Sequence, residues 1–204
     1  MVVLSIDDRR RVSAAIAAAE RRTSGEIVCV LARSSAEPAA LPIFVAALAA
    51  LALPWLLVWL TALPVFAILS LQLAVFAVLA VLLSLPRVRW ALLPAGTRRT
   101  IAERAALEQF VRRGIGNTAG RTGVLVFVSL AERYARIVAD DAIAARVGQA
   151  EWQDAVDALI AHLRDGRIAD GFVVAIERCA NVLAAHFPAA PDDRPELPDR
   201  IYLI

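Results

Sequence analysis

Residues 41–85 read LPIFVAALAALALPWLLVWLTALPVFAILSLQLAVFAVLAVLLSL and decide the architecture of this 204-residue chain. From Pro38 to Pro86 the sequence contains no Asp, Glu, Lys or Arg. A helix needs about 20 apolar residues to cross the ~30 Å hydrocarbon layer of a membrane, and this stretch is about twice as long. The chain can turn only at Thr61–Pro64. The stretch therefore predicts a transmembrane hairpin with the spans Leu41–Leu60 and Val65–Leu85.

The positive charges give this hairpin an expected orientation. All 22 basic residues are arginines; they flank the hairpin on both sides, and the turn between the spans is uncharged. Positively charged flanks stay on the cytoplasmic side. We therefore expect a two-span protein of the inner or plasma membrane, with both termini and the soluble part in the cytoplasm. Residues 1–25 are polar and helical in pattern, unlike a signal peptide. A net charge of +2 does not favour nucleic acid, and the flanking arginines suit anionic lipid headgroups.

The segments on either side of the hairpin are predicted to form one α/β domain. Ser5 begins a helix, and Glu26–Ala32 has the pattern of a strand. Gly123–Val128 is a continuous apolar run, typical of a strand buried on both faces, and Tyr134–Ala139 should pair with it as an antiparallel hairpin. The strand at Glu26 needs the strand at Gly123 as its neighbour, which makes a βαβ unit with the membrane hairpin inserted into the crossover. The expected fold is a small mixed sheet with helices on both faces, interrupted by a two-helix transmembrane hairpin.

This reading divides the chain into four parts. They are the first half of the α/β domain (residues 1–40), the two-span hairpin (41–86), the second half of the domain (87–188) and a tail rich in Pro and Asp (189–204). Thr100–Glu103 fits a capping box that opens the first helix after the hairpin. The tail is expected to be extended, with an apolar end, Ile201–Ile204, that can dock onto the domain.

The second half carries an ordered set of segments that resembles the TPM domain family. They are Glu108–Gly116 (EQFVRRGIG), Thr122–Ser129 (TGVLVFVS), Glu132–Ala139 (ERYARIVA) and Leu163–Gly171 (LRDGRIADG). The first half resembles the family's first helix and strand. Members of that family include a chloroplast thylakoid-lumen protein linked to photosystem repair, with proposed acid phosphatase activity and divalent-cation binding. Bacterial members are often membrane-anchored and encoded near LemA-type membrane proteins.

The resemblance implies a divalent cation such as calcium as a candidate ligand, and other membrane proteins, LemA-type proteins among them, as candidate partners. The sequence departs from the family pattern at two places. Only Met1–Leu4 precedes the first helix, where the family usually has an Asp-containing segment. Ala139–Ala142 (ADDA) stands where the family commonly has a Gly-rich turn. If those elements build the cation or phosphate site, part of it is missing here.

Asp140 and Asp141 are the candidate metal ligands, because two carboxylates at the end of an edge strand suit a hard cation. Glu26 or Glu132 could complete such a site. Adjacent residues in an extended segment point to opposite faces, so the alternative is that the two acids begin a helix or lie at the surface. In that case they would pair with an arginine close by in the sequence. The candidates are Arg133, Arg136 and Arg146.

The remaining reactive side chains are interpreted as structural. Cys29 and Cys179 lie in apolar segments without metal-ligand spacing, as buried free thiols do. Ser129 ends a buried strand, and His162 and His186 lie on later helices, so no positioned nucleophile and base are evident. We therefore expect a membrane-tethered binding or accessory module that acts on other membrane proteins. Two alternatives stay open: a weak divalent-metal-dependent acid phosphatase, and a structural subunit that assembles through its hairpin.

Overall fold

The computed structural model describes residues 4–35, 40–85, 88, 94–190 and 195–204. The chain forms two compact units. One joins Met1–Ser35 to Arg99–Ile204, and the other is Ala36–Arg98. The segments before and after the hairpin thus belong to a single unit.

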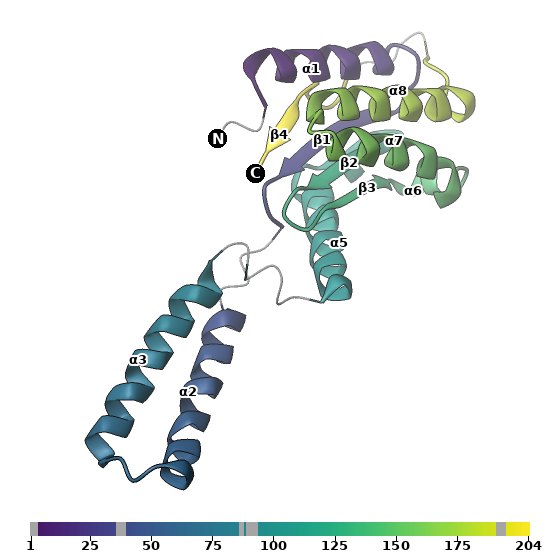
Figure 1. The fold of residues 1–204 in the computed structure, drawn as a ribbon. Coiled ribbons are helices and arrows are strands. Elements are labelled where there is room, and N and C mark those ends of the chain that lie inside the picture. Colours follow the sequence, from purple (N-terminus) through teal and green to yellow (C-terminus); the bar gives the residue numbers. More distant parts are fainter. Residues whose placement is uncertain (1–3, 36–39, 86–87, 89–93, 191–194) are drawn as a thin grey trace. The chain divides into compact units, whose positions relative to one another are not determined.

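A four-stranded mixed sheet forms the centre of the first unit (Figure 1). Its strands are β1 (Glu26–Ala32), β2 (Gly123–Ser129), β3 (Tyr134–Ala139) and β4 (Ile201–Leu203), in the order β3-β2-β1-β4. The strands β1 and β2 pair in parallel, and β2 and β3 pair antiparallel through the predicted turn. The strand β4 adds to the free edge of β1 in parallel, so the apolar end of the tail docks as expected. These pairings confirm the predicted fold class.

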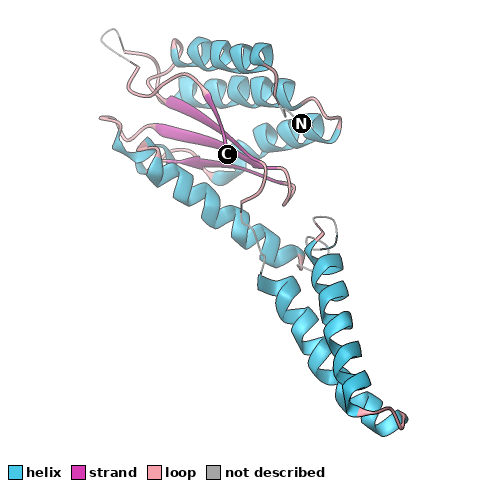
Figure 2. Ribbon diagram, turned by 90° about the vertical axis from the view of Figure 1, so that its left-hand side faces the viewer, coloured by secondary structure: helices cyan, strands magenta, loops and turns pink. Residues whose placement is uncertain are grey.

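Helices cover both faces of this sheet (Figure 2). They are α1 (Ile6–Glu20), α5 (Ala95–Arg112), α6 (Asp141–Ala144), α7 (Gln153–Arg164) and α8 (Ile168–His186), with short 3-10 turns at Ile115–Asn117 and Gln149–Trp152. The helices α1, α7 and α8 pack on one face, and α5 packs on the other. Every residue of β1 and β2 is buried, because side chains that alternate along each strand meet helices on both sides.

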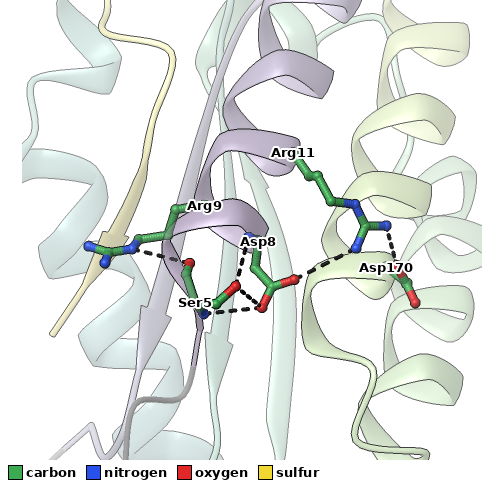
Figure 3. A network of polar contacts seen from close by, with 5 residues as sticks. All are labelled: Ser5, Asp8, Arg9, Arg11 and Asp170. Carbon is green, nitrogen blue, oxygen red and sulfur yellow. Dashed lines mark hydrogen bonds and ion pairs between the residues drawn. The ribbon is translucent and has the colours of Figure 1, made fainter.

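The first helix begins as the sequence predicts. Ser5 is the N-cap of α1, and its hydroxyl accepts a hydrogen bond from the backbone N–H of Asp8 at 3.0 Å. The Asp8 carboxylate accepts in return from the Ser5 backbone, which completes a capping box (Figure 3). Arg11 extends this network to α8 through an ion pair with Asp170 at 2.5 Å. A segment that precedes the hairpin is thereby joined to one that follows it.

The predicted start of the helix after the hairpin is wrong. This helix, α5, begins at Ala95, so Thr100 lies inside it and does not cap it. The backbone N–H of Arg98 already donates to the Pro94 carbonyl at 3.1 Å, which starts the helix more than a turn earlier. The Glu103 carboxylate meets Arg99 and the Tyr134 hydroxyl and therefore has no role at a helix start.

The second unit is a helical hairpin of α2 (Ala40–Leu60) and α3 (Val65–Ser84), joined by the predicted turn. Both helices are long and apolar enough to cross a membrane, over Pro42–Leu60 and Val65–Ser84. Pro54 lies inside α2 without ending it. The small side chains Ala46 and Ala50 are almost fully buried, and large apolar side chains point outward.

Candidate functional site

The two acids that the sequence singles out lie at the end of β3, where α6 begins. Asp140 is the N-cap of α6, and its Oδ1 accepts a hydrogen bond from the backbone N–H of Asp141 at 2.8 Å. The Asp140 side chain is only 3 % exposed, whereas that of Asp141 is 87 % exposed. The pair therefore has the helix-start and surface roles given above as the alternative to a metal site.

One guanidinium group bridges both carboxylates. Arg121 Nε lies 3.1 Å from Asp140 Oδ2, and Arg121 Nη2 lies 2.6 Å from Asp141 Oδ2. Arg121 has a φ of 52°, in the turn before β2, and this left-handed backbone belongs to the residue that pairs with both acids. The geometry is a compact ion-pair group with one buried and one exposed carboxylate.

The predicted arginine partners of this pair are wrong. Arg133 lies in the turn at the opposite end of β3, Arg136 pairs with Glu103, and Arg146 stacks on the Phe187 ring at 4.9 Å. The partner is instead Arg121, 20 residues before Asp141, because the antiparallel register places Val124 opposite Ala139. Proximity in the sequence was a poor guide to a contact that the sheet register sets.

Neither glutamate suggested as a further ligand is free to complete a metal site. Glu132 lies at the other end of β2, where its carboxylate accepts from the Ser129 hydroxyl and from the Ser35 backbone. Glu26 accepts from the backbone N–H groups of Glu196 and Leu197 at 3.1 and 3.0 Å. Among the residues that the structure describes, no three Asp, Glu, His or Cys side chains are grouped to hold a metal ion. Cation binding at Asp140 and Asp141 stays a prediction, and such a cation would compete with Arg121.

Hydrogen bonds to a buried carboxylate join the tail to the start of β1. Glu26 is 6 % exposed and holds the tail by two hydrogen bonds, although burial raises the pKa of its carboxyl. Burial also raises the pKa of Glu20, to about 9, and the nearby carboxylates of Asp199 and Glu26 add to this shift. The raised pKa favours the protonated form of Glu20, and its Oε1 accepts from the Ile27 backbone at 2.9 Å. The sequence suggested Glu26 only as a metal ligand, and no motif in it indicated this contact with the tail.

A cleft opens between the β2–β3 turn and the end of α7, with a volume of about 630 Å³. Apolar side chains form its floor: Leu130, Ala135, Ile160 and Leu163. Arg133 and Arg164 line it as well, and neither guanidinium has a partner among the residues that the structure describes. An apolar floor beside two unpaired cations suits a ligand that joins an apolar group to an anionic one. No sequence signal pointed to this cleft, because its residues come from elements about 30 positions apart.

The other reactive side chains have structural surroundings. Ser129 donates its hydroxyl hydrogen bond to Glu132. His162 Nδ1 contacts the Ala158 carbonyl at 2.8 Å within its own helix, and His186 lies 3.4 Å from Glu151. Cys29 and Cys179 are buried free thiols, as predicted, and burial raises the pKa of both.

Comparison with known proteins supports the resemblance seen in the sequence. The sequence model of the TPM domain family matches residues 90–182. The fold is similar to the NMR structure of the BA42 protein from the psychrophilic bacterium Bizionia argentinensis, with a TM-score of 0.61 and 21 % sequence identity over 98 % of this chain and 95 % of that one. At this identity the likeness shows the fold alone. Among proteins with curated descriptions, none matches the chain.

Proposed function

This chain carries a TPM domain over residues 90–182, and on that premise we propose that it works as a membrane-tethered accessory module that binds other membrane proteins. In this proposal α2 and α3 anchor the chain in the inner or plasma membrane. The α/β domain and both termini face the cytoplasm. The cleft between the β2–β3 turn and α7 binds a segment of the partner protein. LemA-type membrane proteins are candidate partners through the family resemblance.

The observation that carries the tether is the outward face of the hairpin. Phe44, Trp55, Trp59 and Phe66 are each exposed by 60 % or more. Soluble proteins rarely expose continuous apolar patches larger than a few hundred Å². In a bilayer the same side chains would face lipid, so their exposure would carry no free-energy cost from contact with water. The helices satisfy their own backbone hydrogen bonds in that environment.

Two features support binding rather than catalysis. Two polar groups considered for chemistry are bound to other side chains: Asp140 pairs with Arg121, and Ser129 donates to Glu132. The cleft, by contrast, offers two cations without partners in the described part of the chain. A divalent-metal acid phosphatase stays the alternative that the family resemblance suggests, and a structural assembly subunit is the other.

The test uses the full chain in its native membranes. After a carbonate wash, the wild type should remain in the membrane pellet and should co-purify with a defined partner in mild detergent. We expect the cleft variant Arg133→Glu with Arg164→Glu to remain in the pellet but to lose the partner. The matched control is Arg21→Glu with Arg104→Glu, since these two exposed arginines also have no partner among the described residues and lie outside the cleft.

Each part of the proposal has its own contradicting result. Release of the wild type by carbonate would rule out the membrane tether. Equal recovery of the partner with the cleft variant and with the control would remove the cleft from the binding surface. Phosphomonoester turnover that needs a divalent cation and is lost in Asp140→Asn with Asp141→Asn would favour the phosphatase over the accessory module.

A further inference from the structure

The polar side chains of the hairpin differ in whether they have hydrogen-bond partners within it. The Thr61 hydroxyl donates to the Leu57 carbonyl at 2.7 Å, and the Ser70 hydroxyl donates to the Phe66 carbonyl at 2.8 Å. Thr61, in the turn, thus bonds back to the last turn of α2, and Ser70 bonds within α3. The amide of Gln72 makes no hydrogen bond to any residue that the structure describes. An amide without a partner in an apolar medium costs several kcal/mol, on the order of 4–8 in a fully apolar solvent.

Gln72 lies well inside the proposed span. It is seven residues beyond Val65, where α3 begins. At 1.5 Å per residue this places it roughly 10 Å along the helix from that end, within a hydrocarbon layer of ~30 Å. Water does not reach this depth, so the partner of the amide must come from protein.

The amide lines a groove of about 460 Å³ between the two helices of the hairpin. Ala47, Ala50 and Leu51 of α2 and Leu69 and Phe76 of α3 line the same groove. Small side chains such as these alanines allow the backbone of another helix to approach closely. The groove is therefore shaped to receive a further helix beside Gln72.

The backbone hydrogen-bond ladder of α2 is interrupted near this groove. Pro54 has no backbone N–H, so it cannot donate to the carbonyl of Ala50 four residues earlier. Ala50 and Gln72 line the same groove. Carbonyls freed in this way inside a membrane are commonly satisfied by neighbouring helices. The break in the hydrogen-bond ladder of α2 at Pro54 thus lies beside the groove that Gln72 lines.

We infer that the occupant of this groove is a second copy of the hairpin, in a two-fold dimer in which Gln72 meets Gln72. The inference rests on the proposed membrane tether and adds a homodimer to it. Two copies inserted in the same direction hold Gln72 at the same depth, and a two-fold axis along the membrane normal brings equivalent residues together. An amide carries two donors and an acceptor, so two identical side chains satisfy each other. An unrelated helix would need a polar group at this same depth.

The test measures dimerisation of the full chain in phosphatidylcholine and phosphatidylglycerol vesicles. Energy transfer between donor and acceptor fluorescent proteins fused to the N-terminus is recorded over a range of protein-to-lipid ratios. Gln72→Leu should raise the dissociation constant by roughly 5- to 30-fold, the effect of one interhelical polar contact in a membrane. Gln72→Asn keeps an amide and should lose less. Ser70→Ala should match the wild type, because that hydroxyl is satisfied within α3.

Two results would overturn the dimer: a wild type that stays monomeric at every ratio, or a Gln72→Leu variant that dimerises as well as the wild type. Resistance of each variant to carbonate extraction is measured in parallel. A chain that is extracted would refute the membrane tether itself. A chain that resists extraction but is monomeric would refute only the dimer and would assign the groove to a different membrane helix.

Discussion

Removal of the Arg121 guanidinium should destabilise the α/β domain by about 1–3 kcal/mol. Breaking a fully buried ion pair costs about 3–5 kcal/mol, because it leaves an unpaired buried charge. Exposed pairs contribute about 0–1 kcal/mol. Here the Asp140 side chain is 3 % exposed and that of Arg121 is 54 % exposed, so the cost falls between the two limits. The variant of choice is Arg121→Gln, because Gln at φ 52° has much the same backbone strain as Arg, whereas Gly would relieve it.

The assay is thermal unfolding of the full chain in detergent, where this loss corresponds to a fall in Tm of about 3–10 °C. A double-mutant cycle with Asp140→Asn separates the pair from the effects of each change alone. Asp141→Asn is the control and should cost less than about 0.5 kcal/mol, because that side chain is exposed. An Arg121→Gln variant as stable as the wild type would mean that the guanidinium does not stabilise the buried Asp140 carboxylate.

The same variant tests the cation predicted at Asp140 and Asp141. Without the guanidinium, the two carboxylates lose the cation that now bridges them. Millimolar calcium should then raise the Tm of Arg121→Gln more than that of the wild type. The matched control adds Asp140→Asn and Asp141→Asn to Arg121→Gln and should show no calcium effect. An equal effect of calcium on all three proteins would mean that the ion binds elsewhere.

Three further predictions concern packing, pH and topology. Gly123→Ala should destabilise the domain by about 2–3 kcal/mol in denaturant unfolding, because the added Cβ would lie 2.2 Å from the Ile115 carbonyl oxygen. The control Gly148→Ala has open space around the added Cβ and should be neutral, so equal stability of the two variants would contradict this packing. The raised pKa of Glu20, about 9, means that the folded state holds a proton that the unfolded state releases above about pH 4.5. The contribution of this group to folding stability is complete below that pH and is lost as the pH rises toward 9. Between pH 5 and 9, Glu20→Gln should therefore lose about 1–2 kcal/mol less unfolding free energy than the wild type, after allowance for solvent screening. Parallel stability profiles of the two proteins over this pH range would contradict the prediction. Alkaline phosphatase fused to either terminus should be inactive in a bacterial host, and activity at one end would reverse the proposed orientation.

The sequence predicted the sheet well because one physical signal was enough for each step. The strand β2 is a continuous apolar run, and the seven-residue strand β1 cannot stand alone, so the sequence predicted that the two strands pair across the hairpin. The cap at Ser5 was also visible, because a hydroxyl followed three residues later by an acid marks a helix start. The same kind of motif at Thr100 gave a wrong helix start, because the helix already begins at Ala95 and needs no cap at Thr100.

Contacts between side chains of distant segments could not be predicted from the sequence. The pairing of Arg121 with Asp140 depends on the β2–β3 register, and the hydrogen bonds of Glu26 to the tail depend on residues 196 and 197 lying beside the start of β1. The cleft needs the positions of α7 and of the β2–β3 turn. Arginines and acids are numerous in this chain, so nothing in their spacing separates the pairs that form from those that do not.

The most direct test of the account replaces residues 41–85 with a flexible Gly-Ser linker. The α/β domain closes across the inserted hairpin, and the seven-residue pairing of β1 with β2 should not depend on lipid. The shortened chain should therefore leave the membrane fraction, remain soluble, keep a mixed α/β circular dichroism spectrum and unfold in one cooperative transition. A shortened chain that never unfolds cooperatively, or that still pellets with membranes after a carbonate wash, would contradict it.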